Sequence, residues 1–184
     1  MNKSVGVAFC GILTALCTVL MLLTGLVTVG TYALPAIAGL LLIVIVIEMG
    51  SAWAWPVYIA VSVLSVLLAA DKEAAVLYVL FFGYYPVLKA NIEKTGKKYS
   101  AWVLKLLVFN ISMVACFFIS IMLLGVPEES FTINGWYLPW LFLVVGNITF
   151  IIYDYAISSL VLTYYQRFHK LVSGLLNSMQ FRKK

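Results

Sequence analysis

Long runs of apolar residues alternate with short polar breaks along the whole chain. The breaks fall at residues 30–31, 49–51, 71–73, 89–98 and 127–135. A helix that crosses a bilayer needs about 20 mostly apolar residues. The pattern therefore predicts an all-α integral membrane protein with six transmembrane helices, at residues 5–29, 32–48, 52–70, 74–88, 101–126 and 136–165.

The composition agrees with this pattern. Hydrophobic residues make up 64% of the sequence and charged residues only 10%, and the mean hydropathy is +1.07. A soluble domain carries roughly 25% charged residues. No internal repeat and no low-complexity linker separates the runs, so we expect residues 1–184 to form one six-helix transmembrane domain.

The positive charges lie almost entirely on one side of the predicted bundle. Eleven of the twelve Lys and Arg residues fall at the N-terminus, in the basic stretch 89–105 or after residue 166, and Lys72 is the exception. Short loops rich in Lys and Arg stay in the cytoplasm. The pattern predicts cytoplasmic termini in a bacterial plasma membrane, and the net charge of +5 indicates contact with anionic lipid rather than with nucleic acid.

The segment 166–184 has a period of its own. Phe168, Leu171, Val172 and Leu175 recur at helical spacing, with cationic residues between and after them. This pattern is typical of an amphipathic helix that lies on the membrane surface. We expect a short cytoplasmic helix there, either on the inner leaflet or against a partner protein.

Motifs for catalysis are not found in the sequence. It has one histidine, His169, and none of the HExxH, GxSxG or Walker-type patterns. Its three cysteines, Cys10, Cys17 and Cys116, lack the spacing of a metal site or a redox pair. The expectation is a protein that is not an enzyme, with no metal site and no cofactor.

Four ionisable residues fall in the inner half of the predicted bundle: Glu48, Lys89, Lys105 and Asp154. Charged groups at such depth are costly and need a partner or a function. Lys105 and Asp154 lie on consecutive helices, and they can form a pair where the lysine side chain reaches toward the aspartate. Lys89 and Glu48 can instead extend to the interface. A role in proton or ion coupling is the alternative.

Two asparagines, Asn110 and Asn147, lie near mid-membrane on the last two predicted helices. They either bond to each other or contact a buried polar ligand. Aromatic residues gather at the predicted outer edge, where a loop with an amide precedes the last helix. Such a loop suits a planar organic ligand, through stacking and hydrogen bonds. The predicted substrate-binding residues are Tyr32, Tyr78, Asn134, Trp136, Asn110 and Asn147.

The first predicted helix presents small residues along one face. Ala8, Gly11 and Ala15 follow one another at three- and four-residue spacing. Small residues let a neighbouring helix backbone approach closely. The face is suited either to packing within this bundle or to docking by a separate membrane subunit.

Residues 8–16, with the sequence AFCGILTAL, are similar to the first helix of the S components of energy-coupling-factor (ECF) transporters. In that family an AxxxA-like face meets the transmembrane coupling subunit, and Gly11 here takes the place of the first alanine. The last predicted helix, which runs through Asp154 into a basic end, also resembles the family.

The resemblance implies a six-helix subunit that binds a vitamin or a similar small organic micronutrient and does not catalyse a reaction. It also implies a substrate site in the outer half, under the external loops, and docking through Ala8, Gly11 and Ala15 on a coupling subunit carried by two ATPases. Two other classes stay open, a membrane scaffold or accessory protein of cell-envelope machinery and a small intramembrane enzyme.

Overall fold

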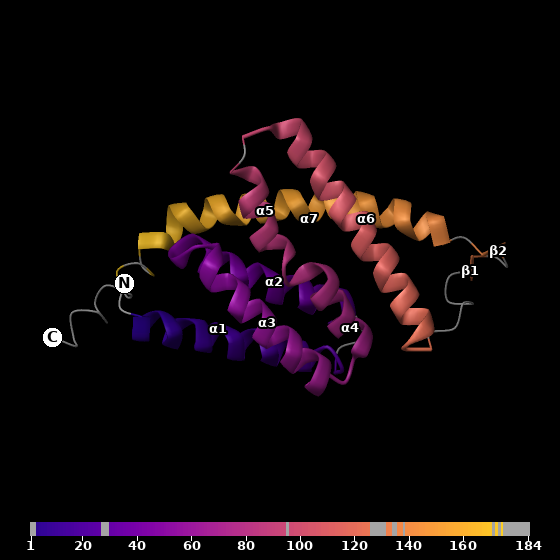
Figure 1. The fold of residues 1–184 in the computed structure, drawn as a ribbon, viewed down its shortest axis with the longest axis horizontal. Coiled ribbons are helices and arrows are strands. Elements are labelled where there is room, and N and C mark those ends of the chain that lie inside the picture. Colours follow the sequence, from indigo (N-terminus) through magenta and orange to yellow (C-terminus); the bar gives the residue numbers. More distant parts are fainter. Residues whose placement is uncertain are drawn as a thin grey trace.

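The structure is a computed structural model that describes residues 3–26, 30–94, 96–125, 132–133, 136–137, 139–170, 172 and 174. Its helices are α1 (Lys3–Leu23), α2 (Gly30–Met49), α3 (Ser51–Leu68), α4 (Lys72–Leu77), the π-helix η1 (Tyr78–Phe82), α5 (Tyr85–Glu93), α6 (Lys98–Met122) and α7 (Pro139–Arg167). Two short strands, β1 (Thr132–Ile133) and β2 (Trp136–Tyr137), pair antiparallel between α6 and α7 (Figure 1).

Six helical segments are long and apolar enough to cross a membrane, which confirms the number of spans predicted from the sequence. Five of them are single helices. The fourth span, Lys72–Glu93, is a composite of α4, η1 and α5. The predicted tail at 166–184 lies largely outside the described residues, and its beginning, up to Arg167, continues α7.

Several predicted boundaries are wrong, for local reasons. The fourth span begins at Lys72 rather than at residue 74, because Asp71 is an N-cap whose carboxylate accepts from the Ala74 backbone N–H at 3.0 Å. Its other end continues past residue 88 to Glu93. The last helix begins at Pro139 rather than at residue 136, since Trp136 and Tyr137 belong to β2. Proline is favoured at the first position of a helix, which is where Pro139 lies.

Helices α1, α2 and α3 pack into one group, seen at the lower left of Figure 1. Their shared core is apolar and includes Leu13, Cys17, Leu42, Ile45 and Val61, all buried. A second core joins η1 and α5 to α6 and α7. It is aromatic: the Phe109 and Phe150 rings stack with centroids 4.6 Å apart, and Phe81 lies against both rings.

The π-helix η1 approaches α2 so closely that only glycine fits between them. A Cβ atom placed on Gly39 would overlap the Phe82 carbonyl group. The two backbones therefore touch at this point, and the contact joins the α1–α3 group to the aromatic core.

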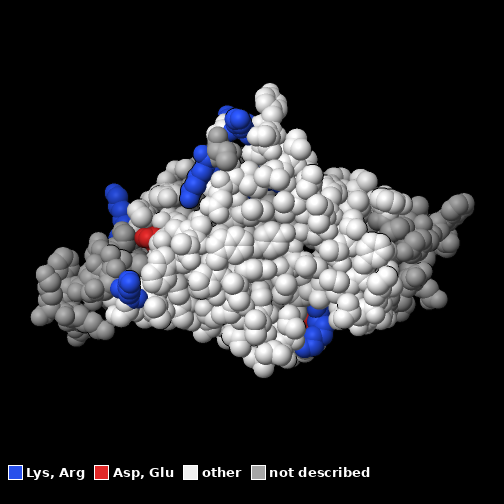
Figure 2. All heavy atoms as spheres, viewed as in Figure 1, with Lys and Arg blue, Asp and Glu red and all other residues white. Residues whose placement is uncertain are grey.

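Large apolar side chains cover much of the outer surface. Ile111 on α6 and Ile152 on α7 are more than half exposed, as are other residues on the same faces. Figure 2 shows a wide uncharged area across the middle of one face, with Lys and Arg in separate groups at its edges. This distribution suits a surface in contact with lipid hydrocarbon. The start of α1 and the end of α7 lie at the same end of the bundle (Figure 1).

Candidate functional site

Four charged side chains meet where α5, α6 and α7 come together. Asp154 on α7 lies between Lys89 on α5 and Lys105 on α6, with Nζ–Oδ distances of 2.6 and 3.1 Å. Both lysines also reach one oxygen of Glu93, the last residue of α5, at 2.8 and 2.6 Å. We call these four residues the charge cluster.

Three of the four side chains in the charge cluster are buried, and the charges of the four sum to zero. Asp154, Lys89 and Lys105 are each 3% exposed, whereas the Glu93 side chain is 47% exposed. Two lysines and two carboxylates sum to zero charge. A buried ion is costly unless it is paired and fully hydrogen-bonded. Tyr85 adds a further bond, since its hydroxyl donates to Asp154 Oδ1 at 2.6 Å.

The spacing on α5 explains how one short helix supplies three of these groups. Tyr85, Lys89 and Glu93 follow at four-residue intervals and so share a face of the helix. The sequence analysis missed Glu93 because the fourth helix was expected to end at residue 88, and it missed Tyr85 because a tyrosine within an apolar span carries no charge that needs a partner. The i, i+4 spacing of Lys89 and Glu93 is the signal in the sequence that points to Glu93 as a partner.

The Lys105–Asp154 pair, which the sequence left open, is present. The interpretation of Lys89 and Glu48 as residues that extend to the interface is wrong. Lys89 points inward to Asp154 instead of extending to the interface, because the buried carboxylate takes a second counter-charge. Glu48 is also held inside: it accepts from the Tyr164 hydroxyl at 2.7 Å and lies 2.8 Å from His169 Nδ1.

The charged groups of the cluster are paired with one another. Every charge in the cluster has a partner of opposite sign, and the Tyr85 hydroxyl donates to the Asp154 carboxylate. Among the described residues, no group of three or more His, Cys, Asp or Glu is placed to hold a metal ion. The arrangement therefore joins three helices, α5, α6 and α7, through ion pairs.

The two mid-membrane asparagines bond to each other. Each Nδ2 donates to the other's Oδ1 at 3.0 Å. Each also donates to a carbonyl one turn earlier on its own helix, Leu106 O or Leu143 O, at 2.8 Å. Of the two alternatives left by the sequence, the structure shows the Asn110–Asn147 bond, and this pair satisfies its N–H groups without a ligand.

The structure describes the side chains of two of the other predicted substrate-binding residues, Tyr32 and Tyr78, and their surroundings differ. Tyr32 is 60% exposed at the start of α2, and its hydroxyl donates to Glu73 at 3.3 Å. Tyr78 is fully buried beside Tyr58, and its hydroxyl has no hydrogen-bond partner among the described residues. Trp136 lies in β2, and Asn134 lies outside the described residues. No hydrogen bond, ion pair or ring contact described here links Tyr32 or Tyr78 to the asparagines.

The small residues of α1 face outward. Ala8, Gly11 and Ala15 are exposed, while Cys10, Leu13 and Cys17 on the opposite face form the contacts with α2 and α3. A Cβ atom placed on Gly11 would meet no other atom within 4 Å. Packing within this bundle therefore does not account for the small residues.

Comparison of the chain with protein-family models, curated proteins and solved structures finds no match.

Proposed function

We propose that this protein is the substrate-binding membrane subunit of an ECF-type importer for a vitamin or a similar small organic micronutrient. In this proposal it binds its substrate and catalyses no reaction. Energy for uptake comes from separate ATPase subunits, which act through a transmembrane coupling subunit.

The outward face of α1 is the observation that carries the proposal. A helix that only contacts lipid has no need of small residues, since lipid chains adapt to any side chain. Ala8, Gly11 and Ala15 are small, exposed and in one line, with open space beyond Gly11. Such a line allows the close backbone approach by which membrane helices associate.

The proposal requires that both chain ends lie in the cytoplasm. The shared position of the start of α1 and the end of α7 supports two ends on one side, and the distribution of Lys and Arg supports the cytoplasmic side. Substrate would then approach from the side that carries the α3–α4 connection and the β1–β2 pair. Tyr32 and Trp136 belong to elements on that side, and together with Asn134 they remain the proposed contacts.

A cysteine-labelling experiment tests the orientation. Lys94 and Ala70 are both exposed, in the α5–α6 and α3–α4 connections respectively. An impermeant thiol reagent on intact cells should label an Ala70→Cys variant and leave a Lys94→Cys variant unlabelled. The native cysteines are buried and provide a low background. The opposite labelling pattern would contradict the proposal.

Substitutions on α1 test the docking. We expect Gly11→Leu and Ala15→Leu to abolish co-purification with a coupling subunit and substrate uptake by cells. The thermal stability of the purified protein should not fall, because both positions are exposed. Ala52→Leu, an equivalent change at an exposed position of α3, is the matched control and should leave uptake intact. Equal effects at all three positions would argue against a specific docking face.

Mass spectrometry of small molecules released from gently purified protein tests substrate binding itself. A stoichiometric organic compound supports the proposal and identifies the substrate. Co-purification of cell-wall machinery with no bound small molecule would instead support the scaffold or accessory class.

A further inference from the structure

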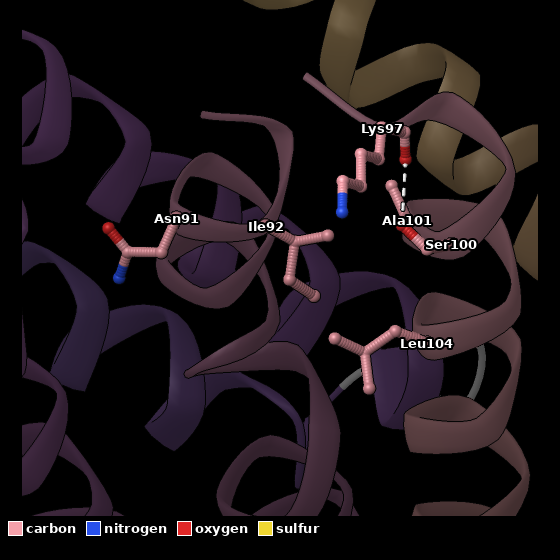
Figure 3. A pocket seen from close by; sticks show the side chains of 6 residues that line it. All are labelled: Asn91, Ile92, Lys97, Ser100, Ala101 and Leu104. Atoms are coloured by element: carbon pink, nitrogen blue, oxygen red, sulfur yellow. Dashed lines mark hydrogen bonds between the residues drawn. The ribbon is translucent and has the colours of Figure 1, made fainter. Parts of the chain in front are cut away.

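A cavity of about 480 Å³ lies between the end of α5 and the beginning of α6. Figure 3 shows the six side chains that line it, Asn91, Ile92, Lys97, Ser100, Ala101 and Leu104. It is open to the surface of the protein on one side rather than enclosed. None of these residues belongs to the charge cluster or to the docking face of α1.

Lys97 and Ser100 supply a cation and a hydroxyl at the start of α6, and the hydroxyl donates to the Lys97 carbonyl at 3.1 Å. Ile92, Ala101 and Leu104 are apolar. Asn91 lies on the other side of Ile92 from Lys97, and its amide oxygen accepts from the Ser51 hydroxyl at 2.9 Å. In Figure 3 the Lys97 side chain extends from the start of α6 toward the gap between the two helices. Lys97 forms no ion pair with any carboxylate of the described residues. The cavity therefore has an uncompensated positive charge at one side and hydrocarbon at the other.

The charge cluster fixes the spacing of these walls. Lys105 lies one turn along α6 from Ala101, and its bond to Glu93 at 2.6 Å joins α6 to the end of α5. Because the four cluster charges cancel, they do not offset the lysines of the connection, Lys94, Lys97 and Lys98. The positive end of the α6 dipole adds to the same potential.

We propose that this cavity binds the phosphate group of an anionic phospholipid, with Lys97 as the contact cation and Ser100 beside it. The apolar wall favours a lipid over a free anion. It leads toward the outer face of α6, where Leu104 and Val103 are well exposed, so an acyl chain can follow the helix. Figure 2 shows Lys and Arg gathered over the α5–α6 connection, next to an uncharged surface. Basic pockets between transmembrane helices bind lipid headgroups in this way.

Titration of the full-length protein in a non-ionic detergent tests the proposal. Short-chain phosphatidylglycerol should bind saturably and raise the unfolding temperature, and phosphatidylcholine of equal chain length should bind much more weakly. Lys97→Gln should weaken phosphatidylglycerol binding at least about tenfold, the effect expected when a hydrogen bond between two charged groups is lost. Lys94→Gln and Lys98→Gln are the matched controls, since they remove the same charge from the same connection without lining the cavity.

A second variant tests the cavity rather than the charge. Ser100 is exposed and lines the cavity, so Ser100→Trp should fill it with little effect on folding, and phosphatidylglycerol binding should be lost. Circular dichroism of the variant checks that the helices are intact. If Ser100→Trp binds lipid as the unchanged protein does, the cavity is not the site and the proposal is overturned.

The remaining arms separate the sources of phosphate. Inorganic phosphate alone, bound with the same dependence on Lys97, would support the phosphate site and identify a soluble anion as its ligand. Equal losses in all three lysine variants would show diffuse attraction to the connection and overturn the proposal. Equal binding of phosphatidylcholine would also overturn it. Gly11→Leu should leave lipid binding unchanged, so this test is independent of the proposed docking on a coupling subunit.

Discussion

Two regions of this molecule hold their helices together with different kinds of contact. The α1–α3 group is held by apolar side chains and by one glycine contact with η1. The junction of α5, α6 and α7 is held by four charges, an asparagine pair and stacked rings. Lipid chains are as apolar as leucine, so burial of apolar surface between helices is a weak drive for association. The complementary shapes of the side chains therefore determine how the helices pack in the first region. In the second region, the packing is determined by polar groups that need hydrogen-bond or ion-pair partners.

The difference is clearest along α6 and α7. The contacts between them run in successive layers: Lys105 with Asp154, Phe109 with Phe150, and Asn110 with Asn147. Two of these three layers are polar. If this interface is specified by polar partners, removal of one partner should cost more there than a comparable change in the α1–α3 group.

The largest expected effect comes from Asp154. An Asp154→Asn substitution leaves two buried lysines with the half-exposed Glu93 as their only carboxylate. Breaking a buried ion pair costs about 3–5 kcal/mol. We expect a loss of this size in the free energy of unfolding, measured with a denaturant in detergent micelles.

A second substitution serves as the control for Asp154→Asn. Lys105→Met in the same chain leaves Lys89 and Glu93 as a neutral pair, so it should recover part of the lost stability. If the double variant is less stable than Asp154→Asn alone, the charges do not act as one balanced group.

Tyr85 should show the next largest effect. Its hydroxyl donates to the buried Asp154 carboxylate at 2.6 Å, and a hydrogen bond to a charged group contributes about 1.5–3 kcal/mol. Tyr85→Phe should lower the free energy of unfolding by that amount. Tyr32→Phe removes the same hydroxyl at an exposed bond of 3.3 Å, so it should change stability by less than about 0.5 kcal/mol. Equal losses of stability in the two variants would show that burial of the hydrogen bond does not matter.

Two glycines test the role of shape. In Gly39→Ala the new methyl group overlaps the Phe82 carbonyl, and overpacking costs about 1–3 kcal/mol. The same change at Gly11 meets open space, so it should be neutral or stabilise α1 by up to about 1 kcal/mol. Thermal unfolding of both variants decides the matter. Tolerance of alanine at position 39 would show that α2 and η1 are not in backbone contact.

The asparagine pair should show the smallest effect of the polar layers. Interhelical hydrogen bonds in membranes contribute about 0.6–2 kcal/mol. Asn110→Ala and Asn147→Ala should each reduce stability by this amount. The double variant should lose less than the sum, since the two residues share one interaction. Additive losses, together with loss of a bound small molecule, would favour the ligand alternative for these asparagines.

The number of spans could be predicted from the sequence alone. Each apolar run has the length that bilayer thickness demands, and this requirement holds whatever the helices pack against. The sequence also brought Lys105 and Asp154 onto consecutive helices in the inner half of the bundle, but it left open whether they pair, and the structure shows the pair. These predictions rest on composition and distance along the chain, which tertiary structure does not alter.

The direction in which each side chain points could be learned only from the tertiary structure. A π-helix turn within the fourth span shifts the helical register, so the face on which Lys89 and Glu93 lie does not follow from an uninterrupted α-helical count. The outward direction of Gly11, the bond between Asn110 and Asn147 and the cavity beside Lys97 arise from how α1, α6 and α7 are placed. Sequence periodicity says which residues share a face, but only the packed neighbours decide whether that face meets lipid, another helix or a ligand.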